Sequence, residues 1–165
     1  VESRKIKIIN TEDLVNIINS TKKKKFSKTH NATKVFQSLR IIVNNEISEL
    51  IYGLINSFKI LPIGGVIVVV SFHSIEDKIV KFFFKNYSEV KNESRYLPSN
   101  KENKKIFKIL EKKPIIPKKQ ETNINPASRS AKLRYGIKLN NHNDFSQFIE
   151  KFNYLLEVES LSKKI

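Results

Sequence analysis

Apolar residues recur every three or four positions between Thr33 and Phe58, a spacing that predicts one long amphipathic helix. Asn31 or Thr33 could cap its N-terminus. Charged and amide side chains fall largely on the opposite side, so we expect this segment to contribute core packing. Its apolar face would hold Phe36, Leu39, Val43, Ile47, Leu50, Leu54 and Phe58.

Shorter helical patterns lie nearer the two ends of the chain. Thr11, followed by Glu12 and Asp13, predicts a helix start in which a hydroxyl caps the first turn and acids face the positive end of the helix dipole. A last helix is predicted by apolar residues at helical spacing. These residues are Phe145, Phe148, Ile149, Phe152, Leu155 and Leu156.

A run of five β-branched residues, Val66 to Val70, follows the paired glycines Gly64 and Gly65. Such a run predicts a strand buried on both faces, as in a parallel sheet. Ser74 and Asp77 then have capping-box spacing for another helix. Helix, turn, buried strand and helix in this order indicate a doubly wound α/β sheet.

Two further strands are expected late in the chain, at Ile106 to Leu110 and at Ala131 to Ile137. No helix is predicted between them. We therefore expect the two to form an antiparallel pair at the edge of the sheet.

The charge balance favours a polyanionic partner. The chain has 31 Lys and Arg against 16 Asp and Glu, a formal net charge of +15, and nucleic acid is the first candidate partner. The alternative is compositional drift, because Lys, Asn and Ile are abundant throughout. The chain has no Cys and three widely spaced His, so neither a disulfide framework nor a metal site is expected.

No apolar run approaches the roughly 18 residues of a membrane span, so no membrane association is expected. The chain contains no Met, so we expect it to be an excerpt from a longer protein.

Ligands of open α/β sheets bind beyond the carboxyl ends of the strands. That rule points to Ser71, Phe72, His73 and Ser74, where an aromatic ring beside hydroxyl and imidazole groups could grip a flat, polar base. Two structural alternatives stay open: Ser74 could simply cap the next helix, and His73 could satisfy backbone groups at the strand end. A Ser-His-acid hydrolase is not expected, because no G-x-S-x-G elbow is present.

Arg129, Lys132 and Arg134 flank the last predicted strand. Basic groups beside hydroxyls and free backbone N–H groups suit contact with phosphates. Protection of an edge strand against aggregation would account for them equally well.

Three long motifs resemble one family, in the family's order. Residues 30–46 read HNATKVFQSLRIIVNNE, similar to its HPATRxFQALRIxVNxE; residues 71–81 read SFHSIEDKIVK, similar to SFHSLEDRxVK; and residues 125–134 read NPASRSAKLR, similar to NPRSRSAKLR. The family is the S-adenosylmethionine-dependent 16S rRNA (cytosine-N4)-methyltransferases. Asn31, Lys34, Lys78 and Ala127 depart from its pattern, and each Lys for Arg loses the guanidinium fork.

The resemblance implies an α/β fold: the C-terminal half of a class I (Rossmann-like) methyltransferase domain, preceded by the end of a helical insertion. Residues 1–28 would close the insertion, 29–138 would form the half-domain, and 139–165 would be a helical tail. The implied function is methylation of the N4 amine of a cytosine in small-subunit ribosomal RNA. The family's glycine-rich cofactor loop is not in this sequence, nor is a P-loop or a G-x-G-x-x-G motif. S-adenosylmethionine would therefore be bound mainly by a preceding segment.

Site roles follow from the motifs and from the strand-end rule together. Ser71 and His73 are predicted to position the substrate base. The predicted RNA contacts are Phe72, Ser74, Arg40, Arg129, Lys132 and Arg134. Expected partners are ribosomal RNA and the small ribosomal subunit, in the bacterial cytoplasm or in a mitochondrion or plastid. A non-catalytic basic RNA-binding module and a fragment of a degenerate gene remain alternatives.

Overall fold

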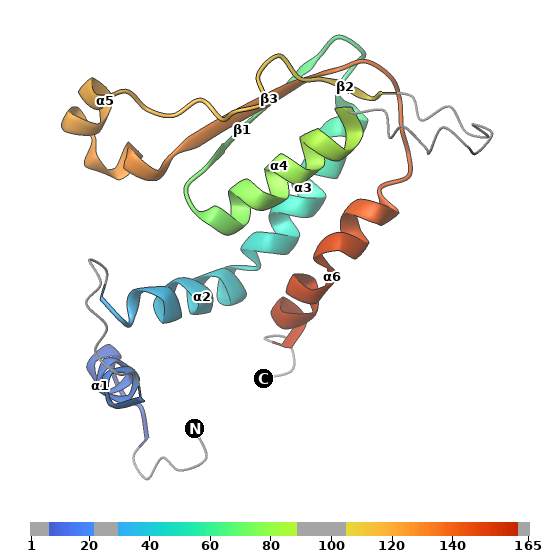
Figure 1. The fold of residues 1–165 in the computed structure, drawn as a ribbon. Helices are drawn as coiled ribbons and strands as arrows, with labels where there is room; N and C mark the ends of the chain where they lie inside the picture. Colours follow the sequence, from blue (N-terminus) through green and yellow to red (C-terminus); the bar gives the residue numbers. More distant parts are fainter. Residues whose placement is uncertain (1–6, 22–29, 89–104, 162–165) are drawn as a thin grey trace, which may run out of the picture.

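The computed structural model describes residues 7–21, 30–88 and 105–161, as a small sheet with helices gathered on one side (Figure 1). Parts of the expected insertion segment, residues 1–6 and 22–29, lie outside the described residues. The elements are, in chain order, α1 (Thr11–Thr21), α2 (Thr33–Asn44), α3 (Glu46–Ile60), β1 (Val66–Ser71), α4 (Ser74–Ser88), β2 (Phe107–Lys108), α5 (Lys119–Ile124), the 3-10 helix η1 (Pro126–Ser130), β3 (Lys132–Lys138) and α6 (Ser146–Ser160).

The three strands lie in the order β1-β3-β2, and β3 runs antiparallel to both neighbours. The predicted antiparallel pairing of the two late strands is therefore confirmed, with Phe107 opposite Lys138. The expectation that no helix separates them is wrong, because α5 and η1 lie between β2 and β3. A mixed sheet that carries helices is consistent with the expected α/β class.

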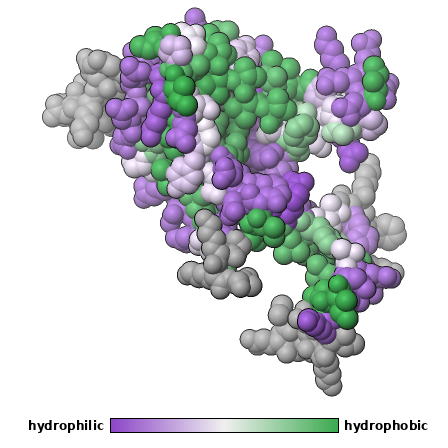
Figure 2. All heavy atoms as spheres, turned by 180° about the vertical axis from the view of Figure 1, so that it is seen from behind, coloured by the Kyte–Doolittle hydropathy of each residue, from purple (hydrophilic) through white to green (hydrophobic). Residues whose placement is uncertain are grey.

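β1 is covered on one face only within the described residues, so the prediction of burial on both faces is wrong there. Ile67 and Ser71 are 7% and 2% exposed, whereas the alternate residues Val66, Val68 and Val70 are 48%, 57% and 50% exposed. Apolar side chains accordingly show at the surface over the sheet (Figure 2). A continuous β-branched run indicates a strand, but it cannot reveal how many faces are covered.

The predicted long helix is interrupted at Asn45, which has left-handed backbone angles (φ 53°, ψ 37°) and separates α2 from α3. Asn adopts this conformation more readily than most residues. Val43, expected on the apolar face, is 72% exposed. Ala32 is the N-cap of α2 and makes no side-chain cap, so the predicted caps Asn31 and Thr33 are also wrong.

The predicted start of α1 is correct to within one residue. Asn10, not Thr11, provides the cap: its Oδ1 accepts the backbone N–H of Asp13 at 2.9 Å. The Asp13 carboxylate in turn accepts the N–H groups of Ile9 and Asn10 at 2.9 and 3.1 Å. This is the reciprocal geometry of a capping box.

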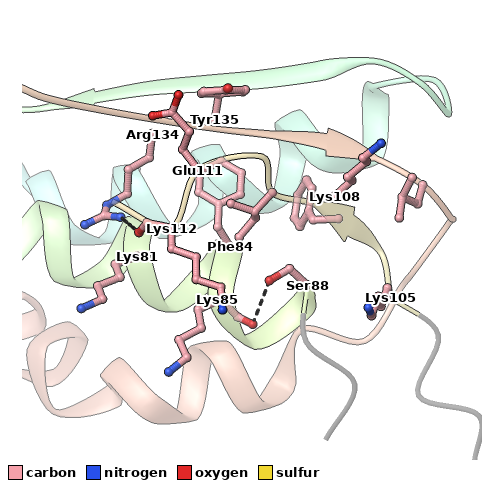
Figure 3. A pocket seen from close by; sticks show the side chains of 13 residues that line it. Lys81, Phe84, Lys85, Ser88, Lys105, Lys108, Glu111, Lys112, Arg134 and Tyr135 are labelled. Atoms are coloured by element: carbon pink, nitrogen blue, oxygen red, sulfur yellow. Dashed lines mark hydrogen bonds between the residues drawn. The ribbon is translucent and has the colours of Figure 1, made fainter. Parts of the chain in front are cut away.

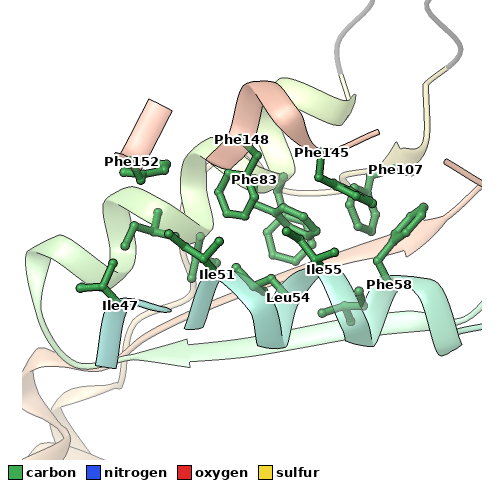
Figure 4. Packing of buried hydrophobic residues seen from close by; sticks show 14 of the residues in the cluster. Ile47, Ile51, Leu54, Ile55, Phe58, Phe83, Phe107, Phe145, Phe148 and Phe152 are labelled. Carbon is green, nitrogen blue, oxygen red and sulfur yellow. The ribbon is translucent and has the colours of Figure 1, made fainter. Parts of the chain in front are cut away.

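The core is built largely of aromatic rings contributed by α3, α4, β2 and α6 (Figure 4). Phe107 packs edge-on against Phe58 and Phe83, with ring centroids 5.2 and 5.3 Å apart. The last helix is confirmed as α6, and its Phe148 and Phe152 are fully buried in the same cluster. In the part of the chain that the structure describes, no helix has both the length and the apolar character needed to cross a membrane.

Buried charges from distant segments bind both ends of α3. At its N-terminus, the Glu159 carboxylate accepts the N–H groups of Ile47 and Ser48 at 2.7 and 2.9 Å. At its C-terminus, the Lys138 ammonium donates to the carbonyls of Phe58 and Leu61 at 2.9 and 2.7 Å. Each charge opposes the partial charge of the helix end that it contacts, so α3 is fixed between β3 and α6.

Neighbouring residues of β1 should differ sharply in their contribution to stability. We expect Ile67→Ala in the 165-residue chain to lower the free energy of unfolding by about 2–4 kcal/mol, because it empties a packed site. Val68→Ala should cost less than about 1 kcal/mol, because that side chain already faces solvent. Urea denaturation of both variants measures the difference, and equal losses would contradict the one-sided burial of β1.

Candidate functional site

The segment Ser71–Ser74 forms a turn between β1 and α4, at the carboxyl end of the strand, as the sequence predicts. Its side chains alternate between interior and solvent. Ser71 is 2% exposed and the His73 side chain 9% exposed, whereas Phe72 is 56% exposed and Ser74 is also exposed. The turn therefore presents an aromatic ring and a hydroxyl outward and keeps the imidazole inside.

The cap of α4 is a reciprocal pair between His73 and Glu76. The His73 Nδ1 atom accepts the backbone N–H of Glu76 at 3.3 Å. One carboxylate oxygen of Glu76 accepts the N–H groups of Phe72 and His73 at 2.8 and 3.2 Å. The predicted capping box of Ser74 and Asp77 is therefore wrong by one residue, with His73 in the place expected for the hydroxyl.

The second ring nitrogen of His73 faces two carboxylates. Its Nε2 atom lies 3.3 Å from Glu76 Oε1 and 3.7 Å from Glu46 Oε2, and it is buried without a hydrogen bond that meets normal geometry. Because Nδ1 accepts a backbone N–H, the ring proton belongs on Nε2, where it points toward the carboxylates. The imidazole is thus held from both sides.

Glu46 is in turn held by groups of α2. The Arg40 guanidinium donates to both Glu46 oxygens, at 2.8 and 3.2 Å, and the Asn44 amide donates at 3.2 Å. Burial acts to raise the pKa of the Glu46 carboxyl, but these hydrogen bonds and the Arg40 charge outweigh it and leave the pKa below its usual value. Glu46 therefore stays anionic beside His73.

Glu46, His73 and Glu76 could together hold a metal ion, since three of their ligand atoms lie within 4.8 Å of one another. Any cation there would compete with the Arg40 guanidinium, which already contacts both oxygens of Glu46. We therefore interpret these residues as a support that orients the His73 ring.

A second charge cluster ties β3 to α4. Asp77 accepts from Lys132 Nζ at 3.0 Å and from Arg134 Nε at 2.8 Å, and Arg134 also donates to the Lys112 carbonyl. Burial alone would raise the pKa of Asp77, but the hydrogen bonds from Arg134 and Lys132 leave it below its usual value. Asp77 thus joins two elements and does not cap α4.

The structure brings some of the predicted site residues together. Arg40 reaches the Ser71–Ser74 turn through Glu46, and the Ser71 hydroxyl donates to the Lys132 carbonyl at 3.4 Å. Arg129 lies in η1 and is exposed.

Sequence reasoning missed the carboxylates that organise the turn: Glu46, Glu76 and Asp77. All three stand inside the recognised motifs. Counting a histidine as a possible cap would have identified Glu76.

The paired glycines do not lie where a cofactor cradle would. Gly64 has φ +86° and, with Gly65, forms a tight turn at the amino end of β1, closed by the Gly65 N–H to the Pro62 carbonyl at 3.0 Å. Ligands bind at the opposite ends of such strands. Among the described residues there is thus no glycine-rich cradle that fits S-adenosylmethionine.

Comparisons with known proteins agree with the motifs. Residues 1–139 match the sequence profile of the MraW methylase family. A protein of Rhodopseudomonas palustris (strain BisA53), named ribosomal RNA small subunit methyltransferase H, is 43% identical over 129 residues, which are 78% of this chain and 39% of that protein. Proteins of the same name from Methylorubrum extorquens and a Sulfurihydrogenibium species are 42% identical over 81% of the chain and 41% over 82%, covering 38% and 42% of their own lengths. The chain thus spans about two fifths of these relatives.

The Asp77 cluster should make stability depend on acid pH. The folded-state pKa of Asp77 lies below 3.8, so its contribution is present above that pH and is lost as pH falls through the folded-state value. We expect Asp77→Asn to cost about 1–3 kcal/mol of unfolding free energy at neutral pH, and this deficit should shrink at lower pH. Denaturation curves at several pH values test this, with Glu150→Gln as the exposed-acid control. A pH-independent deficit would contradict the proposed role.

Proposed function

Since the chain belongs to the MraW methylase family, we propose that it forms the base-binding part of an S-adenosylmethionine-dependent methyltransferase, and that the substrate is the N4 amine of a cytosine in small-subunit ribosomal RNA. The main support is the Ser71–Ser74 turn at the carboxyl end of β1, which holds Phe72 and Ser74 toward solvent above a fixed His73. We infer that the target nucleotide binds there.

The exposed Phe72 ring supplies a surface on which an unstacked base can lie. A base in a duplex must first be flipped out, whereas one in a single-stranded loop is already accessible. Stacking on an aromatic side chain contributes about 1–3 kcal/mol per base. The neighbouring Ser74 hydroxyl can donate to or accept from the polar edge of that base.

Cytosine N4 is a weak nucleophile, because its lone pair is delocalised into the ring. S-adenosylmethionine supplies a methyl group on a sulfonium centre, and the protein must align the amine with it. His73 and Ser71 face inward, so we propose that they act as positioning residues: they hold the turn, and thereby Phe72, in one orientation. The glycine-rich cradle for the methyl donor is assigned to a part of the enzyme outside this chain.

The basic residues predicted to contact RNA differ in how available they are. Arg40 keeps 57% of its side chain exposed while it binds Glu46, and Lys132 keeps 39% exposed. Arg134 is 10% exposed and pairs with Asp77, so its support for RNA binding is indirect. We propose that Arg40, Arg129 and Lys132 contact phosphates near the turn.

The assignment of the cofactor to another segment gives a first test. We expect the 165-residue chain to show no measurable binding of S-adenosylmethionine in titration calorimetry, because the described residues form no cradle for it. A longer protein that carries this sequence together with the rest of the family's length should bind. Micromolar binding by the 165-residue chain alone would refute the assignment, and would also argue against a purely RNA-binding role.

Substitutions in the turn test the base-binding proposal in that longer protein. Phe72→Ala should lower single-turnover methylation about tenfold to a hundredfold, the equivalent of lost stacking, with little change in melting temperature. Phe72→Tyr should retain activity. His73→Ala should lower the rate about tenfold to a thousandfold and also cost about 0.5–2 kcal/mol as a lost cap. A destabilised but fully active His73→Ala protein would remove His73 from the site.

A further inference from the structure

A groove of about 950 Å³ lies between α4, β2 and β3, and basic side chains surround it (Figure 3). Its cations come from four separate segments, and Glu111 is the single carboxylate among the lining residues. The cations are Lys81, Lys85, Lys105, Lys108, Lys112 and Arg134.

The charge of this groove exceeds what the composition of the chain would produce. The chain as a whole has 31 basic residues against 16 acidic ones, whereas six basic residues and one acidic residue line the groove. Among the described residues, Arg134 is paired with Asp77, but none of the five lysines has a carboxylate within ion-pair distance. A concave surface with uncompensated charge of one sign concentrates ligands of the opposite sign.

Helix-end stabilisation does not account for the groove. Lys85 lies in the last turn of α4, where a cation favours the helix dipole. The lysines at positions 105, 108 and 112 come from β2 and its flanking segments, which have no such dipole. The convergence of these segments on one hollow therefore requires another explanation.

The inner surface of the groove is apolar and aromatic. Phe84 and Phe107 lie at its base and Tyr135 lines it. Gly136 permits this arrangement, because a Cβ atom at that position would lie 2.8 Å from the Phe84 ring. Aromatic surface combined with surrounding cations suits a nucleic-acid strand, whose bases and sugars contact rings while its phosphates contact ammonium groups.

The groove is separate from the Ser71–Ser74 turn. Lys81 and Lys85 follow His73 by eight and twelve residues, a distance on the order of 12–18 Å along a helix. A strand that places one base on the turn must extend beyond that nucleotide to fill the groove.

We propose that this groove is a second RNA-binding site, which holds the phosphate backbone of single-stranded RNA that flanks the target nucleotide. The inference rests on the proposed function for the identity of the polyanion, but it assigns a different set of residues. An acidic protein segment would satisfy the cations equally well but would make no use of the aromatic surface, so RNA is the better match.

Salt-dependent binding of a fluorescent oligouridine to the 165-residue chain tests the proposal. The groove variant carries Lys81→Gln, Lys85→Gln and Lys108→Gln. The control variant carries Lys59→Gln, Lys119→Gln and Lys151→Gln, which remove the same charge from exposed positions outside the groove. Each lost phosphate contact lowers the log–log salt slope by about 0.7. We therefore expect the slope to fall by about 2 in the groove variant and the affinity at moderate salt to fall about tenfold, with less than a twofold change in the control.

Equal effects of the two variants would overturn the groove while leaving the methyltransferase proposal intact. Competition by polyglutamate as effective as that by unlabelled RNA would assign the groove to an acidic protein instead, which also overturns it. No RNA binding by the parent chain would count against both proposals. In the longer enzyme, the groove variant should raise the KM for RNA and retain kcat, whereas Phe72→Ala should reduce the rate of the chemical step.

Discussion

The candidate site depends on the reciprocal hydrogen bonds between His73 and Glu76. The Glu76 carboxylate binds the backbone N–H groups of Phe72 and His73, and the imidazole binds the N–H of Glu76. These bonds satisfy orphan donors at the start of α4 and fix the preceding turn at the same time. Phe72 is directed outward because His73 is held inward. A structural cap and a surface for a base are thus two consequences of one arrangement.

Distant parts of the chain keep this arrangement in place. The left-handed Asn45 ends α2 and starts α3, and Glu46, the next residue, faces both Arg40 and the His73 ring. α3 itself is held by buried charges at its two ends, Glu159 and Lys138. The site therefore has a polar frame around an aromatic core, and removal of either partner of a buried pair leaves an uncompensated charge.

The sequence predicted elements whose signals are local and missed those that depend on a single residue or on distant pairing. The strand β1, the helices α4 and α6 and the antiparallel late strands follow from periodicity and turn residues. The cap of α4 was predicted one residue late, because a hydroxyl at Ser74 is the commoner cap type than His73. The break at Asn45 was missed, because apolar spacing continues across it. The pairing of Asp77 with Lys132 joins residues 55 positions apart, and no local pattern encodes it.

The protonation of the His73 ring is the most direct test of this account. Long-range proton–nitrogen correlation spectra of the 165-residue chain, recorded at about pH 9 where imidazole is neutral, distinguish the two tautomers. His73→Asn identifies the signal among the three histidines. We predict that Nε2 carries the proton and that Nδ1 is unprotonated, since Nδ1 accepts the Glu76 N–H. A ring protonated on Nδ1 cannot cap α4, and that result would contradict the proposed organisation of the base-binding turn.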